Sequence, residues 1–339
     1  MPFKIIRNDI TQVKADAVVN AANPQLTIGS GVCGAIFSAA GKELLKKECD
    51  LIGGCETGDA VITKGYNLPA KYIIHTVGPV WHGGNHNEKQ LLINSYKNSL
   101  KLAVENKCES IAFPLISSGV FGYPKEKALE TAIKTISDFL DEHEIMVFLV
   151  VYDKKSFQVS SKRLYQVEKF IDDNYIDEKR LSLPSYNAED RRWIAKEQRR
   201  IEEEDLLEIT FEKASAASTI DELQLELEET FSQMLLRLID ERGMTDPQTY
   251  KRANITRQHF SKIKNKKDYQ PKKVTAAALA VALMLNLEDT NKFLNTAGMT
   301  LSRSIKFDMI IAFHIIHGIY DIYQINEVLF AYDMPLLGA

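Results

Sequence analysis

The chain is poor in cysteine, and its cysteines do not occur in a metal-binding or paired pattern. Its 339 residues include only four, Cys33, Cys49, Cys55 and Cys108. They form no CxxC pair and lack the spacing of zinc ligands, so the sequence predicts neither a metal site nor any other cofactor. Unpaired thiols of this kind are typical of a reducing compartment, and we expect a cytoplasmic protein.

Long apolar runs are also missing. The first residues, MPFKIIRNDI, contain no apolar run between a basic flank and a small-residue cleavage site, so we expect no signal peptide. The most apolar late stretch, Ile305–Tyr320, is interrupted by Asp308, His314 and His317. It is shorter than the ~20 apolar residues that a membrane-spanning helix needs. We therefore expect a buried helix there and no membrane partner.

An excess of positive charge and the common nucleotide motifs are absent as well. The formal net charge of -4 argues against a protein that coats nucleic acid with its whole surface, but it allows a local basic patch. Neither GxGxxG nor GxxxxGK[ST] occurs, which excludes a dinucleotide fold and a P-loop. With 45% hydrophobic residues, the length suffices for two domains with separate cores.

The first half of the sequence alternates short β-branched runs with helical patterns. The expected strands are Phe3–Ile6, Ala17–Asn20, Ala60–Thr63, Tyr72–Val77, Ser110–Pro114 and Ile145–Tyr152. The expected helices are Val32–Cys49, Glu88–Glu105, Lys125–Glu142 and Ser156–Asn174. This alternation predicts an α/β fold with a mostly parallel sheet and helices on both faces. Ligands bind at the carboxyl ends of such strands, here the loops after Val19, Phe113 and Val151.

The character of the sequence changes after about Asn174. A dense run of Glu and Arg, residues 188–205, has the opposite-charge spacing of a solvated helix and predicts a connector. From about residue 220 the pattern is helical throughout. We therefore expect three parts, with a ligand-binding α/β domain in residues 1–175, a charged connector in 176–219, and a separate all-α domain in 220–339.

Three loops of the first half carry side chains or backbone suited to a nucleotide sugar. Asn20 and Asn23 leave a strand, and their amides can bond hydroxyl groups. The loop 28–32 is rich in small residues and precedes a helix, whose free N–H groups attract phosphate. The loop Pro114–Pro124, again between a strand and a helix, offers a second row of N–H groups and Phe121 as an aromatic wall. Either loop alone is weak evidence, since tight turns are common in α/β domains.

Five motifs of the first half resemble those of the macrodomain family, in order and with the right spacing. They are NDIT at Asn8–Thr11, DAVVNAAN at Asp16–Asn23, GSGVCGAIFSAAG at Gly29–Gly41, CETGDAVITKGYNLPAKYIIHTVGPVW at Cys55–Trp81 and IAFPLISSGVFGYP at Ile111–Pro124. The match is best to the branch of O-acetyl-ADP-ribose deacetylases and mono-ADP-ribosyl hydrolases. The resemblance implies a three-layer α/β/α fold with a mixed, mostly parallel sheet, which binds ADP-ribose or an ADP-ribosylated macromolecule.

The resemblance also implies roles for individual residues. Asp9, with Ile10 beside it, would accept a hydrogen bond from the adenine amino group, and Tyr152 would face the adenine ring. Asn23 would hold the distal ribose as the catalytic residue, with Asn20 also among the ligand contacts. The diphosphate and distal ribose would lie between two loops, formed by Gly29, Ser30, Gly31, Val32 and Cys33 on one side and Ser117, Ser118, Gly119, Val120 and Phe121 on the other.

The sequence departs from the hydrolase pattern at three positions. Where that branch reads GGGVDGAIH, this chain reads GSGVCGAIF, with Ser30 in place of the middle glycine. Cys33 stands in place of the aspartate and Phe37 in place of the histidine. Neither residue can replace the acid–base assistance of a carboxylate. Positioning by the asparagine and the substrate's own phosphate remains a route to hydrolysis. Cys33 as a nucleophile is a second route, although free cysteines more often pack as small apolar residues. His75 is expected to be a core histidine with one hydrogen-bonded nitrogen.

The second half contains a pattern that resembles the helix-turn-helix of phage-repressor-like domains. Two short helical segments, Asp246–Ala253 and Thr256–Lys264, flank a turn at Asn254 and Ile255. Basic residues surround the second segment, and the candidate contacts to nucleic acid are Arg257, His259, Lys262 and Lys264. A helical domain that binds a protein partner through a solvated basic face explains the pattern equally well.

These patterns leave three functions open. The first is an enzyme that hydrolyses ADP-ribosyl linkages in mono-ADP-ribosylated protein or in O-acetyl-ADP-ribose, with the helical domain directing it to a partner. The second is a reader that binds ADP-ribose without cutting it. The third is a nucleic-acid-binding regulator that senses ADP-ribose.

Overall fold

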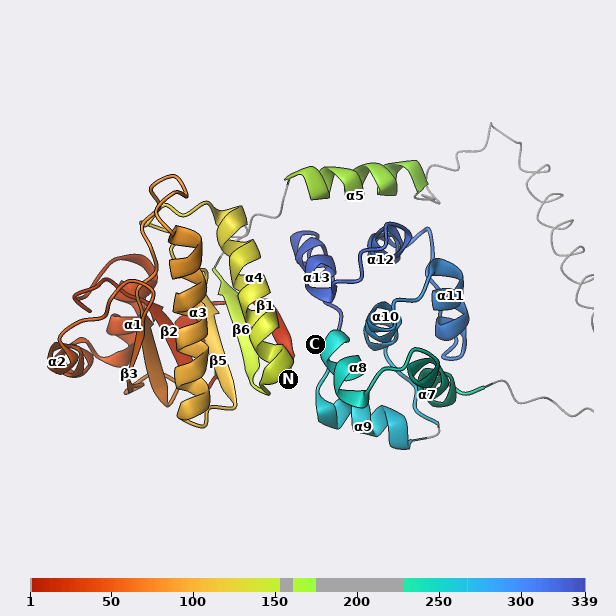
Figure 1. Ribbon diagram of the computed structural model, residues 1–339, viewed down its shortest axis with the longest axis horizontal. Coiled ribbons are helices and arrows are strands. Elements are labelled where there is room, and N and C mark those ends of the chain that lie inside the picture. The colour runs from red at the N-terminus through yellow and green to blue at the C-terminus, as the bar shows by residue number, and fades with distance from the viewer. Residues whose placement is uncertain (1, 153–160, 175–228, 267, 339) are drawn as a thin grey trace, which may run out of the picture.

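The computed structural model of the chain describes residues 2–152, 161–174, 229–266 and 268–338, which form an α/β half and a helical half (Figure 1). The expected connector at 176–219, and both boundaries next to it, lie outside the described residues and stay predictions. Within the described part, no helix combines the length and the apolar character needed to cross a membrane.

The α/β half is built on a mixed, mostly parallel sheet, as expected. The described strands are β1 (Phe3–Arg7), β2 (Ala17–Ala21), β3 (Ala60–Lys64), β4 (Tyr72–Thr76), β5 (Ser110–Pro114) and β6 (Met146–Val151). Their order across the sheet is β1-β6-β5-β2-β4-β3, and β3 is the strand that runs antiparallel to its neighbour. The carboxyl ends of β1, β6, β5 and β2 therefore meet at one edge of the sheet.

Two separate clusters of buried side chains cover the two faces of the sheet. Successive residues of a strand point to opposite faces. In β2 accordingly, Ala17 and Val19 join the cluster that includes α3 and α4, whereas Val18 joins the cluster under α1 and α2. The helices of this half are α1 (Gly31–Ala40), α2 (Lys42–Ile52), α3 (Glu88–Glu105) and α4 (Lys125–Glu142), with a short 3-10 turn η1 (Ile10–Gln12) after β1. The three-layer α/β/α prediction is confirmed.

One helix prediction was wrong. The expected single helix Val32–Cys49 is two helices, because the chain breaks between α1 and α2 at Gly41. Gly41 has φ 101°, which residues with a Cβ rarely adopt, and its N–H ends α1 on the carbonyl of Phe37. The expected helix Ser156–Asn174 is described as α5 (Ser161–Asn174), since residues 153–160 lie outside the described residues.

The C-terminal half is helical throughout its described residues. Its helices are α7 (Phe231–Glu241), α8 (Asp246–Arg252), α9 (Arg257–Asn265), α10 (Lys273–Ala282), α11 (Leu287–Asn295), α12 (Lys306–Ile316) and α13 (Ile322–Ala331). Every residue of α10 from Thr275 to Ala282 is buried, and the other helices surround it (Figure 1). The buried helix expected within Ile305–Tyr320 is α12, whose residues Phe307–Ile315 are all buried.

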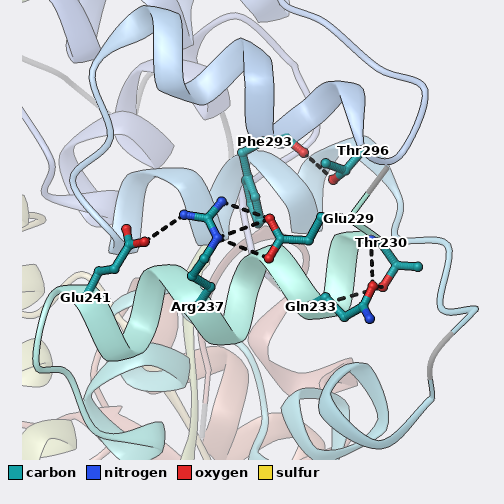
Figure 2. A network of polar contacts seen from close by, with 7 residues as sticks. All are labelled: Glu229, Thr230, Gln233, Arg237, Glu241, Phe293 and Thr296. Atoms are coloured by element: carbon teal, nitrogen blue, oxygen red, sulfur yellow. Dashed lines mark hydrogen bonds and ion pairs between the residues drawn. The ribbon is translucent and has the colours of Figure 1, made fainter. Parts of the chain in front are cut away.

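Helix caps set where these helices begin. Figure 2 shows the start of α7, where Thr230 and Gln233 form a capping box and Arg237 makes ion pairs with Glu229 and Glu241. Such side chains satisfy N–H groups that have no acceptor within the helix. Thr245 and Gln248 form a second capping box at α8, whereas α9 has the Thr256 side chain alone, which accepts from the His259 N–H.

The two halves meet at the edge strand β1. The turn between α8 and α9 places Asn254 against this strand, where its side chain accepts from the Phe3 N–H at 2.7 Å and donates to the Phe3 carbonyl at 2.9 Å. The Phe3 ring also packs on Tyr323 of α13, 5.6 Å between centroids. At the end of α4, Glu144 accepts a hydrogen bond from the Tyr250 hydroxyl at 2.8 Å. The helical half thus covers an edge that would otherwise offer free backbone groups.

Candidate functional site

A cavity of about 750 Å³ lies at the edge where the strand ends meet. Its walls come from the segments after β1 and β2, the loops before α1 and α4, and the end of β6. The lining residues are Asn8, Asp9, Ile10, Ala21, Ala22, Asn23, Gly29, Ser30, Gly31, Val32, Cys33, Ala35, Gly78, Pro114, Leu115, Ile116, Ser117, Ser118, Gly119, Val120, Phe121, Lys125, Val150, Val151 and Tyr152. The predicted site residues are thereby brought together, with the exception of Asn20.

The first wall is the start of α1. Ser30 is the N-cap residue, but its side chain makes no capping hydrogen bond. The N–H groups of the first turn, Gly31 to Cys33, therefore have no acceptor within the helix and line the cavity. Gly34 lets this turn pack closely, because a Cβ there would lie 2.6 Å from the Gly29 carbonyl oxygen. This wall favours an anion.

The second wall is the loop Ser117–Phe121. Hydrogen bonds hold its two ends, from the Tyr123 N–H to the Ser117 carbonyl at 3.0 Å and from the Trp81 N–H to the Phe121 carbonyl at 2.9 Å. Among the residues that the structure describes, no acceptor pairs with the N–H groups of Gly119, Val120 and Phe121. The loop therefore presents a second set of donors to the cavity that the start of α1 also lines.

Close packing behind this loop fixes its position. A Cβ at Gly78 would collide with the side chains of Ser117 and Ile116, so a larger residue there would have to displace them. Ser117 itself has φ 63° and is buried, and its hydroxyl has no partner within the described residues. An unpaired buried hydroxyl costs free energy, which marks this point as one where a ligand can add a hydrogen bond.

Asn23 lies between the two walls, and Thr27 holds its side chain. The Asn23 Oδ1 accepts from the Thr27 N–H at 3.0 Å and from the Thr27 hydroxyl at 3.1 Å, while its Nδ2 donates to the Thr27 carbonyl at 2.9 Å. Both ends of the amide are thus fixed before a ligand binds. One N–H of Nδ2 and the second lone pair of the Thr27 carbonyl remain for other partners.

Cys33 lines the cavity and is itself buried, and its sulfur has two partners. The thiol donates to the Thr27 carbonyl at 3.7 Å and accepts from the Asn20 Nδ2 at 3.7 Å. The sulfur is thus held between a backbone carbonyl and a side-chain amide, and both contacts restrict its position. This geometry supports Cys33 as a packed thiol that ties the Thr27 loop to Asn20.

Asn20 was predicted to contact the ligand, and the structure places it elsewhere. It is fully buried beneath the cavity, on the face of the sheet that α1 covers, and is not among the lining residues. Its Nδ2 donates to the His75 Nδ1 at 3.0 Å. The reason is the pleat of β2, which turns residue 20 to the same side as Val18 and away from the loop.

His75 is a core histidine, as expected, but both of its nitrogens have partners. Its Nδ1 accepts from Asn20, so its Nε2 carries the proton and donates to the Thr63 hydroxyl at 2.9 Å. Burial lowers its pKa to about 4, so the ring is neutral at pH 7. Phe37 packs against this ring at 6.2 Å and is fully buried. The replacement at Phe37 thus lies in the core rather than in the cavity wall.

The predicted adenine contacts, Asp9, Ile10 and Tyr152, all line this cavity. Asp9 is fixed by its Oδ1, which accepts from the Thr11 N–H at 2.9 Å and the Thr11 hydroxyl at 2.8 Å. The Asn8 N–H donates to the Val151 carbonyl at 3.1 Å and so joins the end of β1 to the end of β6. Tyr152 follows directly and is 75% exposed, which leaves its ring open to stack on a base.

Sequence reasoning missed several lining residues. Most are small or apolar, such as Ala21, Ala22, Ala35 and Gly78, and carry no chemical signal. Lys125 is different, because it brings a cation to the cavity at the first position of α4. Lys125 directly follows the motif that ends at Pro124, and this position in the sequence could have suggested it. Asp9 is the one carboxylate in the described lining.

The predicted nucleic-acid contacts all lie on α9 but differ in exposure. Arg257 and Lys262 are exposed. Lys264 forms an ion pair with Asp246 at 2.9 Å, and His259 is half-buried with its Nε2 2.7 Å from the Tyr269 hydroxyl. Burial, with a smaller effect of Lys262, lowers the pKa of His259. Elsewhere in the described residues, no group of three or more His, Cys, Asp or Glu side chains is placed to hold a metal ion.

Comparison with known proteins identifies the α/β half. The family model of the Macro domain matches residues 19–132. The Macro domain-containing protein CT2219 of Chlorobaculum tepidum is 53% identical over 161 residues, which are 47% of this chain and 93% of that protein. The O-acetyl-ADP-ribose deacetylase of Escherichia fergusonii is 50% identical over 168 residues, which are 48% of this chain and 94% of the enzyme.

A solved structure, the macrodomain of Oceanobacillus iheyensis with ADP, is similar over the same half. It is 40% identical, covers 49% of this chain and 92% of its own, and has a TM-score of 0.45. The assignment depends on the curated relatives, which are matched over nearly their whole length at about half identity. Through its N-terminal half, the chain belongs to the macrodomain family.

Proposed function

We propose that the α/β half binds ADP-ribose and hydrolyses ADP-ribosyl linkages, in mono-ADP-ribosylated protein or in O-acetyl-ADP-ribose. The observation that carries this proposal is a single cavity lined by two sets of backbone N–H groups, from the start of α1 and from Ser117–Phe121. Donors on both sides suit a diphosphate. The name of the Escherichia fergusonii relative, O-acetyl-ADP-ribose deacetylase, supports the same substrate class.

The ligand would lie along the cavity with its adenine at Asp9, Ile10 and Tyr152. Asp9 has a second carboxylate oxygen for the adenine amino group, and Tyr152 has an exposed ring for its face. The distal ribose would then reach Asn23 and Phe121, at the end where the scissile bond lies. This orientation follows the family resemblance and agrees with the places of the lining residues.

Hydrolysis would depend on positioning rather than on a protein base. Asp9, the carboxylate of the described lining, would lie at the adenine end, and the Cys33 sulfur is held by the Thr27 carbonyl and the Asn20 amide. A water near the scissile bond would therefore be oriented by the substrate's own phosphate and by the Asn23 amide, which Thr27 holds in place. Positioning of this kind lowers a barrier substantially without proton transfer to the protein.

The test is to measure binding and release with the same preparations. Wild type should bind ADP-ribose and release it from mono-ADP-ribosylated protein or O-acetyl-ADP-ribose. Asn23→Ala should lower the release rate at least about tenfold, because it removes the group that orients the ribose. Cys33→Ala should retain release, since Cys33 serves packing. Tight binding by wild type with no release would reject hydrolysis and leave the reader function.

We propose the nucleic-acid-binding regulator as a second candidate for the helical half. The observation in its favour is that Arg257 and Lys262 lie exposed on α9, the second helix of the pair that resembles a helix-turn-helix. Binding through these side chains should weaken steeply with salt, because phosphate contacts release counterions. If the wild-type protein is not retained on DNA or RNA even at low salt, this candidate is ruled out and a protein partner is favoured.

A further inference from the structure

The adenine end of the cavity is attached to the helical half through Arg7. Arg7 is the last residue of β1 and directly precedes Asn8 and Asp9, which line the cavity. Its guanidinium forms an ion pair with Asp333 at 2.9 Å and lies 5.5 Å over the ring of Phe330, at the end of α13. Arg7, the last residue of β1 before the predicted adenine contacts, is thus held by side chains of the helical half.

The neighbouring strand, β6, is also connected to the helical half. The end of β6 is joined to the end of β1 by the hydrogen bond from Asn8 to Val151, and it continues into Tyr152. Further along the chain, α5 lies along the helical half rather than against the sheet (Figure 1). There Phe170 packs on Phe313 of α12, with 5.4 Å between ring centroids. Both strands that form the adenine end therefore continue into, or contact, the helical half.

We propose that Arg7 is a positioning residue for the adenine site, through which the helical half holds Asn8 and Asp9 in the geometry that binds the base. The proposal rests on the proposed function, because it concerns ADP-ribose in this cavity. Arg7 acts on the ligand through the backbone that carries Asp9. The ion pair with Asp333 and the contact with Phe330 restrict that backbone before the ligand arrives, and preorganisation of this kind strengthens binding.

The decisive variant is Asp333→Arg, because the proposal and simple electrostatics predict opposite results. An added positive charge attracts the diphosphate, so a pure field effect would strengthen ADP-ribose binding. Loss of the ion pair with Arg7 would weaken it, and we expect a Kd about two- to fivefold higher, because both side chains are partly exposed. Asp333→Asn tests the same contact without charge reversal and keeps a residue that tolerates the φ of 55° at this position. It should weaken binding in the same direction.

Two further measurements make the result specific. Arg7→Glu with Asp333→Arg reverses the pair, and it should recover most of the affinity that either single variant loses. Inosine diphosphate ribose, which lacks the adenine amino group, should lose less affinity on Asp333→Arg than ADP-ribose does. Glu288→Arg is the matched control, because it makes the same change of charge on α11, where Glu288 pairs only with Lys292 of its own helix among the contacts of the described chain. Its Kd should equal that of wild type.

Calorimetric titration of full-length protein gives these Kd values, and circular dichroism confirms that each variant is folded. Wild-type affinity in both Asp333 variants, or tighter binding in Asp333→Arg, would overturn the role of Arg7. A wild-type chain that binds no ADP-ribose would instead overturn the proposed function, so the two failures are distinguishable.

Discussion

At the scale of single residues, a short polar chain beneath the cavity shows how buried groups fix one another. The Thr63 hydroxyl accepts from His75, whose other nitrogen accepts from Asn20, and the Asn20 amide also reaches the sulfur of Cys33. The Asn20 Nδ2 can only donate, so the His75 Nδ1 accepts and the Nε2 carries the proton, which fixes the tautomer of the histidine. The Asn20 Oδ1 has no partner within the described residues. Residues below the wall thus determine how Cys33 and the loop above it are held.

The neutral state of His75 predicts a loss of stability in acid. Its folded pKa is about 4, below the ordinary value of 6.5, so the unfolded chain binds a proton that the folded chain does not. Stability is then complete above about pH 6.5 and falls as the pH drops towards 4, by up to about 3 kcal/mol. Urea unfolding at a series of pH values in this window measures the slope. His75→Gln, whose amide can bond both neighbours, should lack this part of the slope, and an unchanged slope would contradict the assignment.

At the scale of elements, the joint between β1 and the turn after α8 carries a specific pair of hydrogen bonds. Asn254 has φ 54°, and its amide matches the free N–H and carbonyl of Phe3 as a neighbouring strand would. Both residues are buried, so water replaces these bonds poorly.

Asn254→Gly should therefore lower the free energy of unfolding by about 1–3 kcal/mol, because glycine accepts the same φ but leaves the Phe3 groups unpaired. Denaturant unfolding of the full chain measures it. Asn87→Gly is the matched control, since Asn87 has φ 61° and makes no side-chain capping bond. It should stay within about 0.5 kcal/mol of wild type. Equal effects of the two substitutions would show that the Phe3 contact contributes nothing.

Local patterns predicted most elements, and the misses have physical reasons. The strand Ser110–Pro114 and the helices Glu88–Glu105 and Lys125–Glu142 match the predictions to the residue, and the two helices begin directly after Asn87 and Pro124. The break at Gly41 was missed, since the apolar spacing continues across it and a single glycine is tolerated in many helices.

The sequence predicted the cavity-lining residues well where a motif lies in a loop, and less well where a motif lies in a strand. Asn23 and the loops at Gly29 and Ser117 line the cavity as expected. Asn20 was misplaced because its amide suggested a ligand, whereas the pleat of β2 decides which way it points. The contact of Asn254 with Phe3 spans 251 residues and has no local signal in the sequence.

At the scale of the whole molecule, the macrodomain and the helical half share a buried apolar cluster. Residues of β1 and α4 belong to the same cluster as those of α8, α10 and α13. The two curated relatives are matched over 93% and 94% of their length by about half of this chain, which leaves little of them to correspond to the helical half. In this chain the helical half contacts the sheet at the edge strand β1.

A chain that ends at Tyr152 should fold but be less stable than the full chain. It loses the contacts of Phe3 with Asn254 and Tyr323, and its β1 edge is uncovered. Differential scanning calorimetry should show a lower Tm, by several degrees at least. Sedimentation should show concentration-dependent self-association, because an uncovered edge strand pairs with other chains. A monomeric fragment with the Tm of the full chain would contradict the sealing role of the helical half.

The seal on β1 also has a consequence for the order of folding during synthesis. Phe3 leaves the ribosome well before its partner Asn254, which is translated 251 residues later. The first strand must therefore pair with β6 and wait with its outer edge open while the second half is translated. Slow translation lengthens this interval, and chaperones that bind exposed strands have their longest opportunity here.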